Sequence, residues 1–111
     1  MTATTAAKIE ERAANPTAMM AQARVASDLM KSLSNETRLM ILCLLSSGEM
    51  TVSEMEDRLH VQQAPLSQQL ARLRNERLVK TRREGRMIHY SIADPNVSEV
   101  VKTLYRIYCP V

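Results

Sequence analysis

The sequence has no tryptophan and no phenylalanine, and its 111 residues include only three tyrosines and two glycines. A β-sandwich needs many turn glycines, so their scarcity argues against that fold. A core of Leu, Met, Ile and Val suits packed helices better. No apolar run approaches the ~18 residues that a membrane-spanning helix requires. The composition therefore favours a single small helical domain that does not cross a membrane.

Cysteine is equally scarce. Cys43 and Cys109 are far apart, and the sequence has no Cys-x-x-Cys pair and no cluster of histidines. These absences argue against a zinc framework, a thioredoxin-like reductase and a disulfide-rich secreted scaffold. Without a plausible histidine partner, a lone cysteine also argues against a hydrolase. We therefore expect a protein that is not an enzyme and carries no cofactor.

Positive charge is concentrated in one segment. The net charge of the chain is only +3, yet residues 72–86 contain seven Arg or Lys against two Glu. A basic block confined to one segment is typical of a surface that binds a polyanion. Charge alone is equally compatible with an ordinary solvated surface.

Helix signals begin after residues 1–15, which we expect to form a flexible N-terminal arm. An Asn-Pro pair starts a helix over residues 16–33, in which apolar side chains recur at helical spacing. Residues 38–45 are apolar on nearly every side, which predicts a buried central helix that ends at Gly48. We expect the folded domain to occupy residues 16–111.

Two short helices come next. Thr51 and Glu54 have the spacing of a capping box, which starts a helix that reaches Leu59. After a turn at residues 60–62, residues 63–75 form a second helix with leucines inward and polar side chains outward. Two short helices joined in this way, the second followed by basic residues, are typical of a DNA-binding helix-turn-helix.

The hydrophobic period then changes from that of a helix to that of a strand. Residues 79–83 and 87–92 favour β-structure, and Glu84-Gly85 between them predicts a hairpin turn flanked by arginines. Asp94-Pro95 starts a last helix with an apolar stripe that reaches Tyr108. The expected fold is mainly α with a small β-hairpin, namely a winged helix-turn-helix with five helices.

The outer face of the second short helix is the predicted DNA-reading surface. An α-helix fits the major groove, where Gln, Ser and Arg meet the base edges, while basic residues of the wing neutralise phosphates. Glutamines on a helix are more often plain surface, but the adjacent basic wing favours DNA. The predicted DNA-binding residues are Gln63, Pro65, Ser67, Gln68, Arg72, Arg82, Arg83 and Arg86.

Three stretches of the chain resemble the ArsR family of bacterial repressors, and the likeness covers about residues 26–109. The similar stretches are residues 29–43 (LMKSLSNETRLMILC), 66–74 (LSQQLARLR) and 82–86 (RREGR). The resemblance implies a dimer whose first and last helices pack across a two-fold axis and which releases operator DNA when an inducer binds. Two positions depart from the family pattern: Gln62 replaces a usual Ser cap, and Arg77 a frequent Gly. A left-handed conformation at Arg77 would cost on the order of 1 kcal/mol.

The last helix and the Met-rich first helix predict a homodimer, because an unpaired amphipathic helix would expose a large apolar patch. Two recognition helices related by a two-fold axis imply an inverted-repeat operator in double-stranded DNA. We therefore expect a cytoplasmic, nucleoid-associated bacterial protein. The predicted interface residues are Met19, Met20, Val97, Val101, Leu104 and Tyr108.

Many members of the ArsR family sense metals, but the ligand positions are not filled here. The Cys-x-Cys positions of one family site resemble Glu54 and Glu56, and the last helix has no His for another. Soft metals need converging thiolates or imidazoles. We therefore expect no metal.

Cys43 and Cys109 are the remaining candidates for a sensor. A cysteine in an apolar helix is usually a small hydrophobic residue, which is one interpretation of Cys43. The placement of the pair is nevertheless similar to the persulfide-responsive branch of the ArsR family, in which two thiols join through sulfur and DNA binding weakens. The resemblance implies redox-sensing cysteines and a per- or polysulfide inducer. A metal, an oxidant or no inducer is the alternative.

Overall fold

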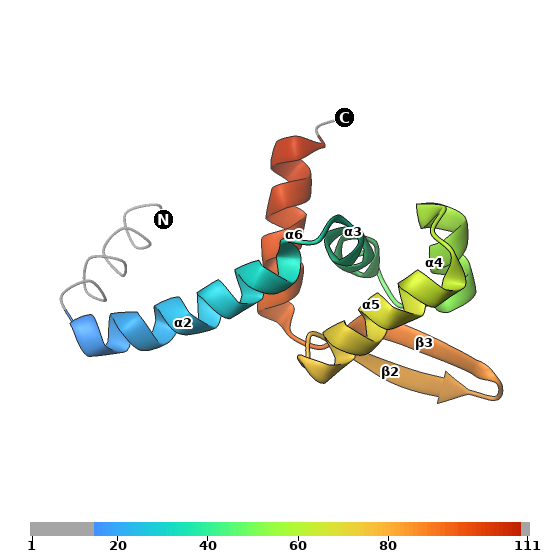
Figure 1. The fold of residues 1–111 in the computed structure, drawn as a ribbon, viewed down its shortest axis with the longest axis horizontal. Coiled ribbons are helices and arrows are strands. Elements are labelled where there is room, and N and C mark those ends of the chain that lie inside the picture. Colours follow the sequence, from blue (N-terminus) through green and yellow to red (C-terminus); the bar gives the residue numbers. More distant parts are fainter. Residues whose placement is uncertain (1–14, 110–111) are drawn as a thin grey trace. The chain divides into compact units, whose positions relative to one another are not determined.

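A computed structural model describes residues 15–109, with the backbone alone at Gln63 and Ala64. The expected N-terminal arm therefore lies outside the described residues except for Asn15. The chain divides into two units, residues 1–31 and 32–111 (Figure 1). Within the described part, no helix is both long and apolar enough to cross a membrane.

The described part of the first unit is helix α2 (Pro16–Leu33), whose last two residues belong to the second unit. It starts as predicted, because the Asn15 side chain accepts a hydrogen bond from the Ala18 N–H at 3.3 Å and Pro16 takes the first helical position. The helix leaves several large apolar side chains exposed. These are Met19, Met20, Val25 and Met30.

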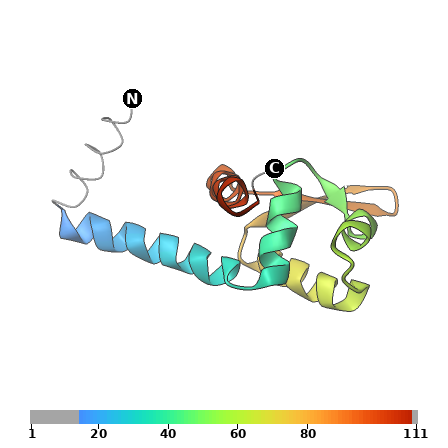
Figure 2. The ribbon, with the colours of Figure 1, turned by 90° about the horizontal axis from the view of Figure 1, so that it is seen from above.

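The second unit contains four further helices and a three-stranded sheet. Its elements are α3 (Glu36–Leu45), β1 (Met50–Thr51), α4 (Val52–Leu59), α5 (Gln63–Asn75), β2 (Val79–Glu84), β3 (Met87–Ile92) and α6 (Pro95–Tyr108). Figures 1 and 2 show α3 between α6 on one side and the α4–α5 pair on the other, with the β2–β3 hairpin extending from the unit. The five described helices and this hairpin confirm the predicted winged helix-turn-helix.

Helix α3 provides the centre of the core, where Ile41, Leu42 and Leu45 are buried. It begins two residues earlier than predicted, because the Asn35 side chain accepts a hydrogen bond from the Arg38 N–H at 3.0 Å. It also ends earlier, since Ser46 rather than Gly48 is the C-cap.

The expectation that α3 is buried on every side is wrong for the single chain. Its neighbours α4, α5, α6 and β3 leave part of the helix uncovered. Met40 is accordingly 49% exposed, and Cys43 is only half-buried.

The helix-turn-helix forms as the sequence predicts. The Thr51 hydroxyl accepts a hydrogen bond from the Glu54 N–H at 3.2 Å, and the Glu54 carboxylate accepts one from the Thr51 N–H at 3.0 Å. The hydrogen bonds that Thr51 donates hold the pKa of Glu54 below its ordinary value. Leu66, Leu70 and Leu73 of α5 are fully buried, as predicted. This packing turns the polar positions of α5 outward.

The sheet has one strand more than the predicted hairpin. The strand order is β1-β3-β2, and both pairings are antiparallel. The hairpin turn lies one residue later than predicted, at Gly85-Arg86, because Glu84 still pairs with Met87. Gly85 takes a positive φ of 60° in this two-residue loop, a conformation that glycine adopts at little cost.

Helix α6 begins at the predicted Asp94-Pro95 signal, where the Asp94 side chain accepts a hydrogen bond from the Asn96 N–H at 2.9 Å. Its apolar stripe divides between two environments. Val97 and Val101 are buried in the core of the protomer, where α6 packs against α3. They have no surface left for a partner, which corrects their predicted place at a dimer interface.

Candidate nucleic-acid interface

The outer face of α5 carries the polar residues predicted to read DNA. Pro65, Ser67, Gln68 and Arg72 are all exposed, whereas the side chain of Gln63 lies outside the described residues. Gln69 points inward instead, and its side-chain oxygen accepts a hydrogen bond from Arg38 Nη1 at 2.9 Å. Because α5 is held from its inner side, its outer polar groups are free to face a groove.

Arg72 has an acidic partner that the sequence analysis did not assign. Its Nε lies 3.2 Å from an oxygen of Glu76, one helical turn later. The Glu76 carboxylate also accepts a hydrogen bond from the Ser32 hydroxyl at the end of α2. Burial opposes ionisation of Glu76, but the hydrogen bonds from Ser32 and Arg72 hold its pKa below the ordinary value. The positive charge of Arg72 is therefore partly neutralised within the protein.

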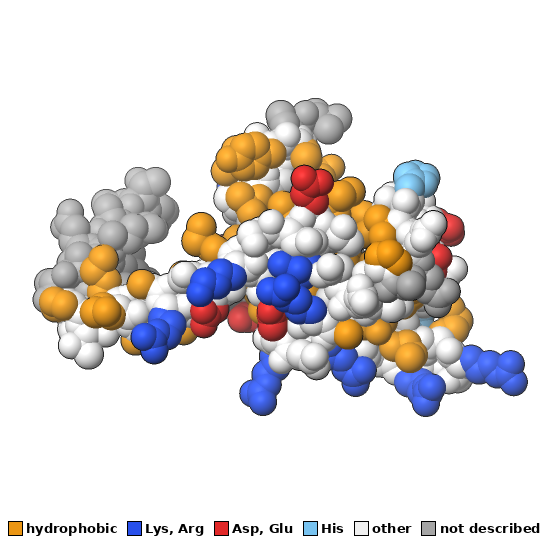
Figure 3. Space-filling view, viewed as in Figure 1, with side chains coloured by type: hydrophobic (Ala, Val, Ile, Leu, Met, Phe, Trp, Pro, Cys, Tyr) orange, Lys and Arg blue, Asp and Glu red, His pale blue; other side chains and the backbone are white. Residues whose placement is uncertain are grey.

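Five basic side chains near α5 and the hairpin are exposed and have no acidic partner among the residues that the structure describes. They are Arg74, Arg77, Lys80, Arg83 and Arg86. Figure 3 shows basic side chains in a row along the lower edge of the second unit. Arg77 takes the left-handed conformation that its position after α5 implied, with a φ of 62°. The five exposed residues belong to the basic segment, residues 72–86, for which the sequence predicts binding to a polyanion.

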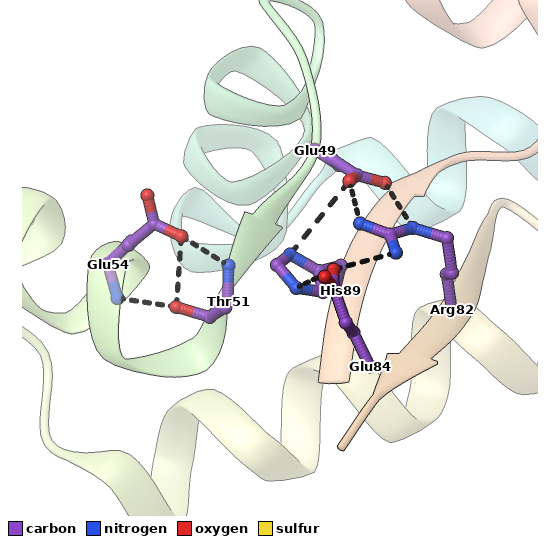
Figure 4. A network of polar contacts seen from close by, with 6 residues as sticks. All are labelled: Glu49, Thr51, Glu54, Arg82, Glu84 and His89. Atoms are coloured by element: carbon purple, nitrogen blue, oxygen red, sulfur yellow. Dashed lines mark hydrogen bonds and ion pairs between the residues drawn. The ribbon is translucent and has the colours of Figure 1, made fainter. Parts of the chain in front are cut away.

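Arg82 differs from the other basic residues of the wing. Its guanidinium contacts Glu49, just before β1, and Glu84 on its own strand (Figure 4). The hydrogen bond from Arg82 holds the pKa of Glu49 below its ordinary value, and the same contacts raise the pKa of Arg82. The sequence analysis missed Glu49, because no local pattern links it to a residue so far along the chain.

The two cysteines are distant in the sequence but lie on helices that pack against each other, α3 and α6. Cys43 is on α3, Cys109 is the exposed C-cap of α6, and both are free thiols. Burial raises the pKa of the Cys43 thiol, and the neighbouring Cys109 raises it further. Cys43 is therefore a poor nucleophile at neutral pH, whereas Cys109 is open to solvent.

The side chains considered as metal ligands do not come together in the structure. Among residues 15–109 there is no group of three or more His, Cys, Asp or Glu side chains that could hold a metal ion. Glu54 is occupied instead in capping α4.

A helix-turn-helix followed by a basic β-hairpin defines a winged-helix DNA-binding protein. Residues 35–81 match the family described as "Bacterial regulatory protein, arsR family". The chain is 42% identical over 81 residues to the transcriptional activator HlyU of Vibrio cholerae, covering 73% of this chain and 75% of HlyU. It is 40% identical over 92 residues to the biofilm growth-associated repressor of Agrobacterium fabrum, covering 83% and 79%.

A solved structure of reduced HlyU from Vibrio cholerae superposes with a TM-score of 0.78 at 40% identity, covering 82% of this chain and 96% of that one. The chain belongs to the arsR family of bacterial regulatory proteins. It is thus a winged-helix transcriptional regulator, as the resemblance implied, and these relatives are regulators rather than enzymes.

The exposed wing arginines generate a prediction about DNA affinity. Replacing Arg83 and Arg86 together by alanine should weaken binding to operator and random DNA alike, because these residues are placed to neutralise phosphates. The slope of log affinity against log salt should fall by about 0.9 for each phosphate that is no longer neutralised. Fluorescence anisotropy over a salt series measures both quantities.

Two controls accompany this measurement. Lys102→Ala removes an exposed positive charge from α6, away from the hairpin, and should leave the salt slope unchanged. Gln68→Ala should reduce the preference for operator over random DNA. Unchanged affinity and slope in the Arg83 and Arg86 double variant would show that the wing does not contact DNA.

The thiols generate a second prediction. With N-ethylmaleimide at neutral pH, Cys109 should be alkylated faster than Cys43, because Cys43 is less exposed and its raised pKa leaves less thiolate. The rate at Cys43 should still be rising as the pH passes 9.0, the ordinary value for a thiol. Peptide mapping of timed samples follows both sites, and Cys43→Ser isolates the reaction of Cys109. Faster labelling of Cys43 at pH 7 would contradict this assignment.

Proposed function

We propose that this protein is a homodimeric repressor that binds an inverted-repeat operator and releases it when reactive sulfur links Cys43 to Cys109. The observation that carries the proposal is the placement of the two free thiols on helices that pack against each other, one on α3 and the other at the C-cap of α6. Two of the matched relatives support it in different ways. The relative from Agrobacterium fabrum is named a repressor, and the solved structure of HlyU is named as the reduced form of HlyU.

The exposed apolar surface of the chain supports dimerisation. Tyr105, Ile107 and Tyr108 on α6 are each more than half exposed, as are Met20 and Met30 on α2. A group of exposed apolar side chains such as the one at the end of α6 is unusual for a monomer. The family resemblance implies that a second copy of the chain covers these side chains.

A shallow hollow also lies on α6. It has a volume of about 300 Å³ and is lined by Asn96, Glu99, Val100, Thr103 and Leu104. Leu104, one of the predicted interface residues, is only partly covered by its own chain. We therefore assign the interface to Met19 and Met20 of α2 and to Leu104 and Tyr108 of α6.

The proposed chemistry starts at the exposed thiol. The Cys109 thiolate attacks a sulfur atom of an inorganic polysulfide, forms a new S–S bond and displaces a shorter polysulfide anion. When two added sulfur atoms remain on the Cys109 thiol, the Cys43 thiolate attacks the added sulfur that is bonded to Cys109. The terminal sulfur leaves as hydrosulfide. The product is a trisulfide bridge, in which both thiols have been oxidised by two electrons in total and sulfur of the polysulfide has been reduced to hydrosulfide.

The raised pKa of Cys43 fits the second of these roles. A resolving thiol reacts only after Cys109 has been modified, so it gains from proximity more than from a large thiolate fraction. A plain disulfide requires Cα atoms within about 7 Å, whereas a bridge with an added sulfur atom spans more. A thiol separation beyond that limit would favour polysulfide over peroxide.

Bridging would affect DNA through α3. This helix packs against both α5, the recognition helix, and α6, the proposed dimer helix. A covalent link from Cys43 to Cys109 ties α3 to the end of α6 and restrains the angle between the two recognition helices of the dimer. A modification shifts a conformational equilibrium only when it favours one of the states, and this restraint favours the state that does not fit the operator.

The interface generates a prediction about assembly. The wild-type protein should sediment as a dimer at micromolar concentration, and Tyr105→Glu combined with Tyr108→Glu should make it monomeric, because two buried charges without partners are costly. Met87→Glu is the matched control, since Met87 is as exposed as Tyr105 but lies on the wing. A stable wild-type monomer would disprove the proposed dimer.

The thiol switch generates a prediction about operator affinity. Reduced protein should bind the operator, and polysulfide should weaken binding about tenfold or more, which corresponds to about 1.4 kcal/mol per decade. A reductant should restore the affinity. Fluorescence anisotropy measures these changes, and intact mass spectrometry reports the added sulfur atoms.

The single variants Cys43→Ser and Cys109→Ser should bind the operator but lose the response, because neither thiol can form the bridge alone. Peroxide and oxidised glutathione, applied in parallel, separate a sulfur-specific response from general oxidation. An equal response in wild type and both variants would show that the inducer acts elsewhere.

A further inference from the structure

Arg82 makes contacts that span the whole sheet. It lies on β2, where it pairs across the sheet with His89 of β3, and His89 pairs in turn with Thr51 of β1. Glu49 lies two residues before Thr51, next to β1. To reach Glu49, the Arg82 side chain must pass over the central strand, as Figure 4 shows. The contact therefore joins the outer strand of the wing to the segment that leads into α4.

All three nitrogens of the Arg82 side chain are engaged. Nη2 lies 2.5 Å from Glu49 Oε1 and Nε lies 3.4 Å from Glu49 Oε2, so both oxygens of one carboxylate are used. Nη1 lies 2.9 Å from Glu84 Oε2. Planar two-point contacts of this kind fix orientation as well as distance. The Arg82 guanidinium consequently has a defined position in the free protein.

His89 completes the cluster beneath the guanidinium. Its side chain is only 16% exposed, with Nδ1 3.9 Å from Glu49 and Nε2 3.6 Å from Glu84. Around the single charge of Arg82 there are thus two carboxylates, so the cluster is not a positive site. An additional phosphate there would meet two negative charges.

Arg83 has the opposite environment. Successive side chains of a strand point to opposite faces of the sheet, so Arg83 faces away from Arg82 and pairs across the hairpin with Ile88. Arg83 is exposed, and so is Arg86 in the hairpin loop. Together with Lys80 of β2, these two residues, rather than Arg82, provide the uncompensated positive charge of the wing.

We propose that Arg82 is a positioning residue, which ties the wing to Glu49 and so presents Arg83 and Arg86 to the DNA backbone in a fixed orientation. The sequence had suggested a phosphate contact for Arg82. The new role rests on the proposed contact between the wing and DNA. Thr51 begins α4, so the same tie fixes the wing relative to the helix-turn-helix.

The substitution Glu49→Gln distinguishes the two roles by the sign of its effect. If Arg82 were a phosphate contact restrained by Glu49, the substitution would release it and tighten DNA binding. If Arg82 positions the wing, the substitution should weaken binding about two- to fivefold, the effect of losing one exposed ion pair. Glu84→Gln is the matched control, because it removes the same charge nearby and leaves the two-point contact with Glu49. It should not weaken binding.

Salt dependence and a conservative variant give a second distinction. Arg82→Ala and Arg82→Lys should weaken binding as much as Glu49→Gln does and leave the salt slope unchanged, since lysine keeps the charge but cannot make the two-point contact. Arg83→Ala should lower the slope by about 0.9 for each phosphate that Arg83 neutralises in the wild type. Arg82→Ala combined with Glu49→Gln should cost no more than either change alone.

Hydrogen exchange of the free protein tests, without DNA, whether the contact between Arg82 and Glu49 holds the wing in place. Amides of residues 83–87 should exchange faster in Glu49→Gln than in the wild type, while those of α5 remain unchanged. Tighter DNA binding by Glu49→Gln, a lower salt slope in Arg82→Ala, or unaltered exchange would each overturn the proposal. If Arg83→Ala changes neither affinity nor slope, the wing contact itself fails, and accelerated exchange would still establish the tie.

Discussion

Helix α3 packs against α5 on one side and α6 on another, and the positions of both candidate sites depend on this packing. Ile41, Leu42 and Leu45 form the centre of the core together with leucines of α5 and valines of α6. Burial of each such side chain contributes about 1.5–3 kcal/mol. Because the three helices share one core, a change at the end of α6 can reach α5 through α3. The thiol of α3 lies on that route.

The DNA-binding surface has fewer unpaired positive charges than a count of its basic residues indicates. Arg72 and Arg82 have carboxylate partners within the chain, so they contribute less to the field that a phosphate meets. The positive surface that remains follows α5 and the wing, where Arg83 and Arg86 are exposed. The presence or absence of an acidic partner thus distinguishes the basic residues that are paired within the protein from those available to DNA.

The two cysteines occupy different environments, which fits the order of reaction proposed for them. Cys109 ends a helix and is exposed, whereas Cys43 is half-buried and has a raised pKa. A thiol of raised pKa resists indiscriminate oxidation but still reacts with a partner held beside it. Such an arrangement would suit the proposed sensor, which must ignore dilute oxidants and respond to a reagent that first modifies Cys109.

Much of the fold was determined by local signals in the sequence. The capping box of Thr51 and Glu54 formed as predicted, as did the starts of α2 and α6, because a cap joins groups only two or three residues apart. The inward leucines of α5 followed from helical spacing alone. Tertiary structure decided the features that depend on distant neighbours.

Strand β1 exists only because β3 lies beside it, and Arg82 found its partner Glu49 across that pairing. The apolar stripe of α6 could be predicted, but its division into buried Val97 and exposed Tyr108 depends on how far α3 covers the helix. The packing of α6 against α3, the helices that carry the two cysteines, is likewise decided by tertiary structure. Periodicity reports which face of an element is apolar, whereas only the assembled core determines what covers that face.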